Sequence, residues 1–97
     1  MANTYSETRS DLRWIADELE NLELTYKIYN YGVQYNVKDL NGIIHSYYPT
    51  TGTMLFHASN DRNDRRSKVI RDASFEEFVS YVTEPERIQE LFKERKV

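Results

Sequence analysis

The sequence has no cysteine among its 97 residues, which excludes disulfide bonds and thiolate metal sites and fits a reducing cytosol. It has only three glycines, and they lie well apart, so a glycine-rich phosphate loop is excluded. No apolar run approaches the ~20 residues of a membrane span, and the first residues lack a secretory signal pattern. We therefore expect one cytoplasmic domain spanning residues 1–97, with no membrane association.

Residue patterns that carry catalysis or bind metals are also scarce. The only histidines, His45 and His57, are predicted on opposite faces of a sheet, so they cannot share a metal ion or a proton. The acidic residues lie mainly on predicted helices, at spacings typical of solvated, charge-paired faces. No nucleophile elbow or His-Glu-x-x-His pattern occurs. We therefore predict that the protein is not an enzyme and has no catalytic residue, no metal ligand and no cofactor.

Three helices are predicted, one before the strands and two after them. Each is marked by a Ser or Thr three positions before a Glu, the spacing of a capping box. Trp14 lies outside the apolar stripe of the first helix, nearly opposite Leu12 at about 100° per residue. It is either a side chain that lies partly exposed over its own helix or is covered by a terminus, or an anchor for another protein. The three capping pairs are Thr4 with Glu7, Ser74 with Glu77 and Thr83 with Glu86.

The middle of the chain is rich in tyrosine and alternates between apolar and polar residues, the period of a β-strand. Turn signals divide it, and Asn41-Gly42 is the strongest because both residues tolerate the positive φ of a type I′ turn. The fold class is predicted to be α+β: an N-terminal helix, a four-stranded antiparallel β-meander and two C-terminal helices. The predicted strands are 24–29, 33–38, 43–48 and 53–58, with 68–71 as a candidate for a short fifth strand.

A two-residue turn at Asn41-Gly42 would pair Leu40 with Ile43, and hence Tyr35 with Tyr48. One face of the sheet then forms a core under the first helix. The second face either packs under the C-terminal helices or stays exposed as a stacking platform for bases or a protein-binding patch. Its predicted members are Lys27, Tyr29, Gln34, Asn36, Lys38, Ile43, His45, Tyr47, Met54 and Phe56.

Positive charge is concentrated in residues 60–71, although the net charge of the chain is −3. The arginines of this segment have two possible roles. They either pair with the neighbouring Asp61 and Asp64 on a flexible surface loop, or they bind a partner through its phosphates or an acidic groove. General nucleic-acid binders are usually basic overall, so the acidic balance favours a protein partner. The basic residues concerned are Arg62, Arg65, Arg66 and Lys68.

The segment from Asn30-Tyr-Gly-Val-Gln-Tyr to Tyr48-Pro-Thr-Thr-Gly-Thr resembles a type seen in small bacteriophage accessory proteins. In those proteins a helix precedes a hairpin with an Asn/Gly turn, and a strand ending in aromatic-Pro-Thr-Thr-Gly leads into another strand. Some proteins of this size and charge inhibit host defence, including anti-CRISPR proteins that bind a Cas effector. The order of helices and sheet also resembles a double-stranded-RNA-binding domain, but the basic residues here precede the second helix instead of starting it.

Two functions follow as expectations. The first is a non-enzymatic, phage-derived inhibitor that binds a host defence protein in the host cytoplasm, most concretely a Cas nuclease, as a monomer or homodimer. The alternative is a small module that binds single- or double-stranded RNA or DNA through an aromatic sheet face and the basic loop. The predicted partner-binding residues are Arg62, Arg65, Arg66, Lys68, Trp14, Tyr29, Tyr47 and Phe56.

Overall fold

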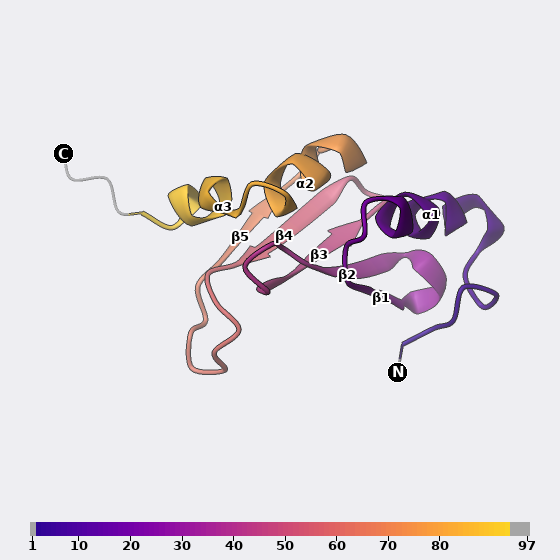
Figure 1. Ribbon diagram of the computed structural model, residues 1–97, viewed down its shortest axis with the longest axis horizontal. Coiled ribbons are helices and arrows are strands. Elements are labelled where there is room, and N and C mark those ends of the chain that lie inside the picture. The colour runs from indigo at the N-terminus through magenta and orange to yellow at the C-terminus, as the bar shows by residue number, and fades with distance from the viewer. Residues whose placement is uncertain (1, 94–97) are drawn as a thin grey trace.

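The computed structural model describes residues 2–93 and has two layers, an antiparallel sheet with strand order β1-β2-β3-β4-β5 and α-helices on one of its faces (Figure 1). The α+β class is confirmed, and the candidate fifth strand is present, so the sheet has five strands rather than the predicted four. None of the helices in the described chain is long and apolar enough to cross a membrane. The strands are β1 Tyr26–Tyr29, β2 Gln34–Lys38, β3 Ile44–Tyr48, β4 Thr53–His57 and β5 Ser67–Ile70. The helices are α1 Arg13–Asn21, α2 Phe75–Val82 and α3 Pro85–Leu91, with short 3-10 turns at Ser10–Leu12 and Asn30–Gly32.

The first helix begins later than its capping box predicts. The Glu7 carboxylate does accept a hydrogen bond from the Thr4 amide, at 2.8 Å. The α-helix nevertheless starts only at Arg13, because the buried Thr8 hydroxyl donates to the Thr4 carbonyl at 3.0 Å and holds this segment as a turn. The Arg13 guanidinium also donates to the carbonyl of Thr8 at 3.0 Å, which ties this turn to the start of the helix.

The two C-terminal capping predictions have different outcomes. Ser74 caps α2 as predicted, since its hydroxyl accepts from the Glu77 amide at 3.1 Å. Thr83 does not begin α3, because its hydroxyl donates back to the Val79 carbonyl at 2.7 Å and lies at the end of α2. Helix α3 starts instead with Pro85 in its first turn, where the missing amide costs nothing.

The β2–β3 hairpin differs from its predicted register by one residue. Tyr35 pairs with Tyr47 instead of Tyr48. The connection is a five-residue loop, 39–43, and not a two-residue Asn41-Gly42 turn, because the Asp39 side chain organises it. The pairings predicted on either side of this hairpin, Ile28 with Tyr35, Tyr48 with Thr53 and Ser46 with Leu55, are confirmed.

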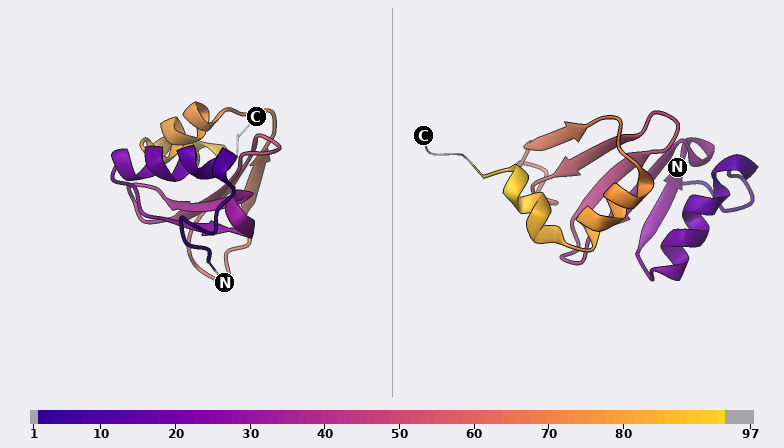
Figure 2. Two further views of the ribbon diagram at one scale, coloured as in Figure 1. Left: turned by 90° about the vertical axis from the view of Figure 1, so that its right-hand side faces the viewer. Right: turned by 90° about the horizontal axis from the view of Figure 1, so that it is seen from above.

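This shift turns every side chain of β3 and β4 to the other face. Tyr47 and Phe56 therefore face the helices, with 4% and 0% of their surface exposed, which matches the alternative in which the C-terminal helices cover them. Their prediction as partner-binding residues is wrong, because a partner cannot reach buried rings. Tyr47 and Phe56 both stack on Phe78 of α2, with ring centroids 5.2 and 6.0 Å apart. All the helices share this one face (Figure 2). The buried cluster between the layers includes Ile15, Leu19, Ile28, Tyr35, Val37, Tyr47, Met54, Phe56, Phe78, Val82 and Ile88.

The two edges of the sheet differ. Along β1 the N-terminal segment adds a bridge, in which the Asn3 amide donates to the Ile28 carbonyl at 2.7 Å. The Asn3 side chain also accepts from the Tyr31 amide at 2.7 Å. Along β5 none of the described residues adds a further strand, and Val69 is 54% exposed there.

We expect replacement of Gly32 by Ala to destabilise the protein more than replacement of Gly42 by Ala. Both glycines have positive φ, +100° and +85°, which costs a residue with a Cβ about 1 kcal/mol. A Cβ on Gly32 would also lie 2.5 Å from Cγ2 of the buried Thr8, whereas nothing lies within 4 Å of one on Gly42. Urea unfolding should show a loss for G32A that exceeds that for G42A by roughly 1–3 kcal/mol. Equal losses would contradict the close approach of Thr8 to the 30–32 turn.

Candidate functional site: the open sheet face and the basic loop

None of the helices described between residues 2 and 93 packs on the second face of the sheet (Figure 2). We call this surface the open face. It mixes cations, tyrosines, amides and a few aliphatic side chains, so it lacks the continuous apolar character of a buried face. Its members are Lys27, Tyr29, Gln34, Asn36, Lys38, Ile44, Ser46, Tyr48, Thr53, Leu55, His57, Ser67 and Val69.

Amide and hydroxyl groups fix the centre of the open face. The Asn36 side-chain oxygen accepts from the Gln34 amide at 3.0 Å and from the Ser46 hydroxyl at 2.8 Å. The first bond lies within β2, and the second connects β2 to β3 at Ser46, which is only 5% exposed. The centre is therefore rigid and polar, as a preorganised binding surface requires.

A shallow hollow of about 210 Å³ lies on the open face beside this centre, lined by side chains from β1, β2 and the start of β3. Lys27 and Lys38 are exposed on its rim, and neither forms an ion pair with any residue between 2 and 93. Tyr29 and Ile44 add apolar surface. The hollow therefore combines positive charge with an aromatic wall, which suits an anionic group attached to a flat or apolar body.

Residues 58–66 form the loop between β4 and β5, which we call the basic loop. It extends from the sheet on the side opposite the helices (Figure 1). The Asn60 side chain fastens it to the start of β3, accepting from the Ile44 amide at 3.0 Å and donating to the Gly42 carbonyl at 2.7 Å. The loop is thus positioned next to the open face.

The cations of the basic loop divide into two groups. Arg66 donates two hydrogen bonds to the Asp64 carboxylate, at 2.9 and 2.8 Å, and these hold the pKa of Asp64 well below its usual range. Arg66 therefore shapes the loop, as in the alternative in which the arginines pair with neighbouring aspartates. Arg62 and Arg65 are exposed and form no ion pair within the described chain. Lys68 pairs with Phe56 across β4 and β5, which places it on the helix face near the end of α3.

Trp14 lies on the other side of the molecule, on α1. It is 48% exposed, and its ring meets Phe75 of α2 edge to face with centroids 5.3 Å apart. Trp14 is therefore partly exposed, as one interpretation predicts, although its covered part packs against α2 rather than over its own helix. Its role as an anchor for another protein stays a prediction. The structure does not bring Trp14 together with the arginines of the basic loop.

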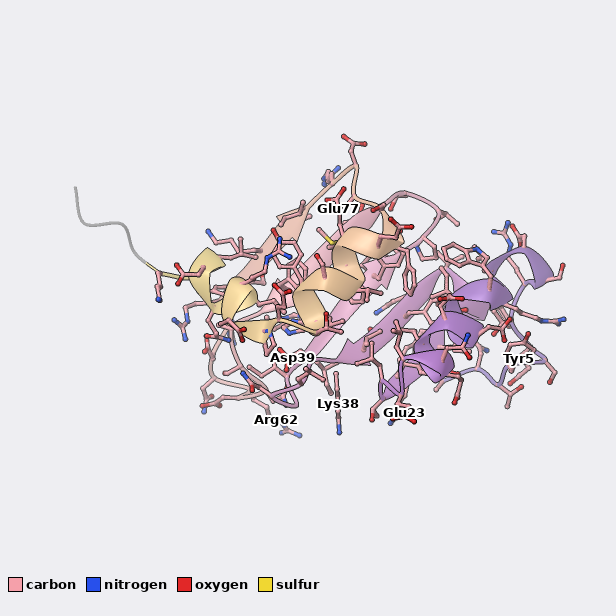
Figure 3. All side chains as sticks on the ribbon, turned by 45° about the horizontal axis from the view of Figure 1, so that its top comes forward. Tyr5, Glu23, Lys38, Asp39, Arg62 and Glu77 are labelled. Carbon is pink, nitrogen blue, oxygen red and sulfur yellow. The ribbon has the colours of Figure 1, made fainter. Side chains whose placement is uncertain are left out.

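Acidic and basic side chains lie on opposite sides of the molecule. Helices α1 and α2 carry one basic residue, Arg13, and five acidic residues, Asp17, Glu18, Glu20, Glu76 and Glu77. In Figure 3, Glu77 lies on the helix side, and the side chains of Lys38 and Arg62 extend from the opposite side. The molecule thus presents an acidic helical surface and a basic sheet surface.

A buried pair, Asp39 and His45, is a feature that sequence reasoning missed. Their side chains are fully buried and 2.8 Å apart. Nδ1 of His45 accepts from the His57 amide at 3.0 Å, so the proton of the neutral ring lies on Nε2 and is donated to Asp39. The available signal was an Asp two residues before Asn41, a spacing at which a carboxylate caps a turn.

The Asp39–His45 pair does not have the geometry of a catalytic dyad. Both ring nitrogens are already bonded, one to Asp39 and one to the backbone of His57, so no nitrogen points toward an accessible space. His45 and His57 come from opposite faces, as predicted, although their rings lie 6.5 Å apart where β4 ends. No group of three or more potential metal-ligating side chains occurs among the residues that the structure describes.

Comparisons with known proteins gave a uniform result: no protein-family model, no curated protein and no solved structure matches this chain.

We expect acidification from about pH 7.5 to about pH 5.5 to destabilise the protein through His45. Burial lowers the pKa of His45 in the folded state, and the hydrogen bond with Asp39 opposes this shift only in part. As the pH falls through about 6.5, His45 therefore takes up a proton in the unfolded chain but not in the folded chain. Proton uptake favours the unfolded chain, so the free energy of unfolding decreases as the pH falls below that value.

Urea unfolding measured at several pH values checks this expectation. One such proton contributes a slope of at most about 1.4 kcal/mol per pH unit. His45→Gln should remove this contribution, and His57→Gln, a matched change on the opposite face, should keep it. An unchanged slope in H45Q would contradict the assignment.

Proposed function

We propose that this protein is a non-enzymatic binding protein, and specifically a phage-derived inhibitor that binds a host defence protein in the host cytoplasm. A Cas effector is the most concrete partner. The observation that carries the binding role is the open face beside the basic loop, with four exposed cations, Lys27, Lys38, Arg62 and Arg65, that form no ion pair in residues 2–93. The resemblance of residues 30–53 to phage accessory proteins supports the inhibitor role.

The size of the surface supports joint use of the sheet and the loop. Strands about 4.8 Å apart and about five residues long give five strands a flat area of roughly 400 Å². A stable protein interface buries about 800 Å² on each partner, so the open face alone is too small. The basic loop extends it on the same side. Arg62 and Arg65 would then provide bidentate contacts to carboxylates of the partner around the tyrosines and aliphatic side chains of the face.

The double variant Arg62→Glu/Arg65→Glu should bind the partner at least tenfold more weakly, a loss of about 1.4 kcal/mol. Its folding should change by no more than about 0.5 kcal/mol, because both side chains are exposed. The measurement is co-purification with a panel of guide-loaded Cas effectors, followed by affinity determination and a target-DNA cleavage assay with any effector retained.

The matched control is Arg9→Glu/Lys93→Glu, which changes the net charge equally at exposed positions outside the sheet and the basic loop. This control should bind like the original protein. If both double variants lost affinity for the partner equally, net charge rather than the position of Arg62 and Arg65 would explain the loss. If no effector retained the original protein, the Cas assignment would be refuted.

A second candidate function is binding of nucleic acid. The observation that favours it is a row across the open face, where Tyr29 pairs with Gln34 and Tyr48 pairs with Thr53. Continuing the β2–β3 register places Gln34 beside Tyr48, so the two tyrosines flank one amide with cations on the same face. Aromatic side chains on a cationic sheet stack with bases of single strands.

Fluorescence anisotropy with labelled single-stranded oligonucleotides and a short RNA duplex tests this candidate. Four phosphate contacts by Lys27, Lys38, Arg62 and Arg65 would give a salt slope of about −2.8 on a single strand. Affinity should then fall about 50-fold between ~50 and ~200 mM salt. Tyr29→Leu/Tyr48→Leu should weaken binding with little change in that slope. No binding at ~50 mM salt with about 100 μM protein would exclude this function.

A further inference from the structure

A groove of about 720 Å³ separates α1 from α2 on the helix side of the sheet. Figure 2, right, looks onto this side, where α1 and α2 lie next to each other. The groove is lined by one stripe of α1 and by the first turns of α2. Its lining residues are Trp14, Glu18, Leu22, Ser74, Phe75, Glu76 and Val79.

Two large apolar side chains of the groove are exposed. Trp14 and Leu22 are 48% and 43% exposed, although both are large apolar side chains. Leu22 directly follows α1 and lies eight positions after Trp14, with Glu18 midway, so the three residues share a stripe about 12 Å long. This stripe points in a different direction around the helix axis from the stripe of Ile15 and Leu19, whose side chains are fully buried against the sheet. Helix α1 therefore has one apolar stripe that the fold covers and one that it leaves open.

The rim of the groove is negatively charged. Glu18 and Glu76 line opposite walls, and neither forms an ion pair with another residue in the range 2–93. Helix α2 has no basic residue. The only cation on α1, Arg13, donates its hydrogen bonds to the carbonyls of Ser6 and Thr8 and so is engaged away from the groove.

We propose that this groove binds an amphipathic helix of a partner protein whose apolar stripe is flanked by lysine or arginine. About two turns of such a helix place apolar side chains at i, i+4 and i+7 along roughly 10 Å, which fits the distance between Trp14 and Leu22. Basic flanks would meet Glu18 and Glu76. A second copy of this chain fits less well, because α1 and α2 are themselves acidic and α3 carries a single arginine.

This surface is independent of the open face, since the two lie on opposite sides of the sheet. The protein would then hold two partners, or two parts of one partner, at the same time. An experiment that refutes binding at the open face would not refute binding in the groove, and an experiment that refutes binding in the groove would not refute binding at the open face.

Trp14 is the only tryptophan in the chain, so its fluorescence reports occupancy of the groove directly. The probe is a synthetic 18-residue helix-forming peptide with leucines at i, i+3, i+4 and i+7 and lysines beside them. A matched peptide carries glutamate in place of each lysine. Titration with the lysine peptide should shift Trp14 emission to shorter wavelength and saturate, with an affinity at least tenfold higher than that of the glutamate peptide.

Glu18→Lys/Glu76→Lys should weaken binding of the lysine peptide at least tenfold with the fold intact by circular dichroism. Glu86→Lys/Glu90→Lys, an equal charge change at exposed positions of α3, should bind like the original protein. Three results would each overturn the proposal: no emission change with the lysine peptide, equal binding of both peptides, or equal binding by E18K/E76K and the original protein.

Discussion

The carboxylate of Asp39 determines which face of the sheet is buried. One of its oxygens accepts from the amides of Asn41 and Ile43, at 2.8 and 3.0 Å, and the other bonds to His45 at 2.8 Å. A buried carboxylate needs such donors, because leaving it unbonded would cost several kcal/mol. Together these bonds favour the five-residue loop over a two-residue turn. The pairing of Tyr35 with Tyr47 follows from that loop length.

The same loop connects separate parts of the fold. The Leu40 amide donates to the Val82 carbonyl at the end of α2, at 3.1 Å, and the Gly42 carbonyl accepts from Asn60 of the basic loop. The loop thus joins the helical layer to the surface on the other side of the sheet. Because the register places the apolar side chains of the sheet on one face, α1, α2 and α3 all pack against that face. A two-layer α+β arrangement results. The separation of acidic and basic sides is a consequence of placing all the helices together.

Much of the architecture could be predicted from the sequence, because it depends on local signals. Alternation between apolar and polar residues located the strands, and the Ser74 cap located α2. The register could not be derived from the same signals. Asn41-Gly42 suits a type I′ turn on its own, and the competing bonds of Asp39 include one to His45, six residues away. An error of one residue there reverses β3 and β4, so it changes which side chains of these strands lie on the same face as Tyr35.

The candidate site was predictable to a smaller extent. The exposed positions of Arg62 and Arg65 follow from composition, and the pairing of Arg66 with Asp64 was one of two alternatives that the spacing allowed. Sequence alone could not place Lys68 near α3 or bring Tyr48 onto the same face as Tyr29, because both depend on pairing between strands. The groove beside Trp14 depends on how two helices far apart in the chain sit on the sheet.

The unequal edges of the sheet limit how this protein can assemble. Asn3 covers part of the β1 edge, since its amide bonds to Ile28 and its side chain bonds to the Tyr31 amide beside that strand. The outer edge of β5 is not paired by any strand of residues 2–93, so it is the more available edge for strand addition. Two copies that joined at this edge would pair β5 with β5 about a two-fold axis. The unpaired backbone groups of both β5 edges would then be hydrogen-bonded to each other. Strand addition between copies of the folded chain at β5 would therefore give a closed dimer.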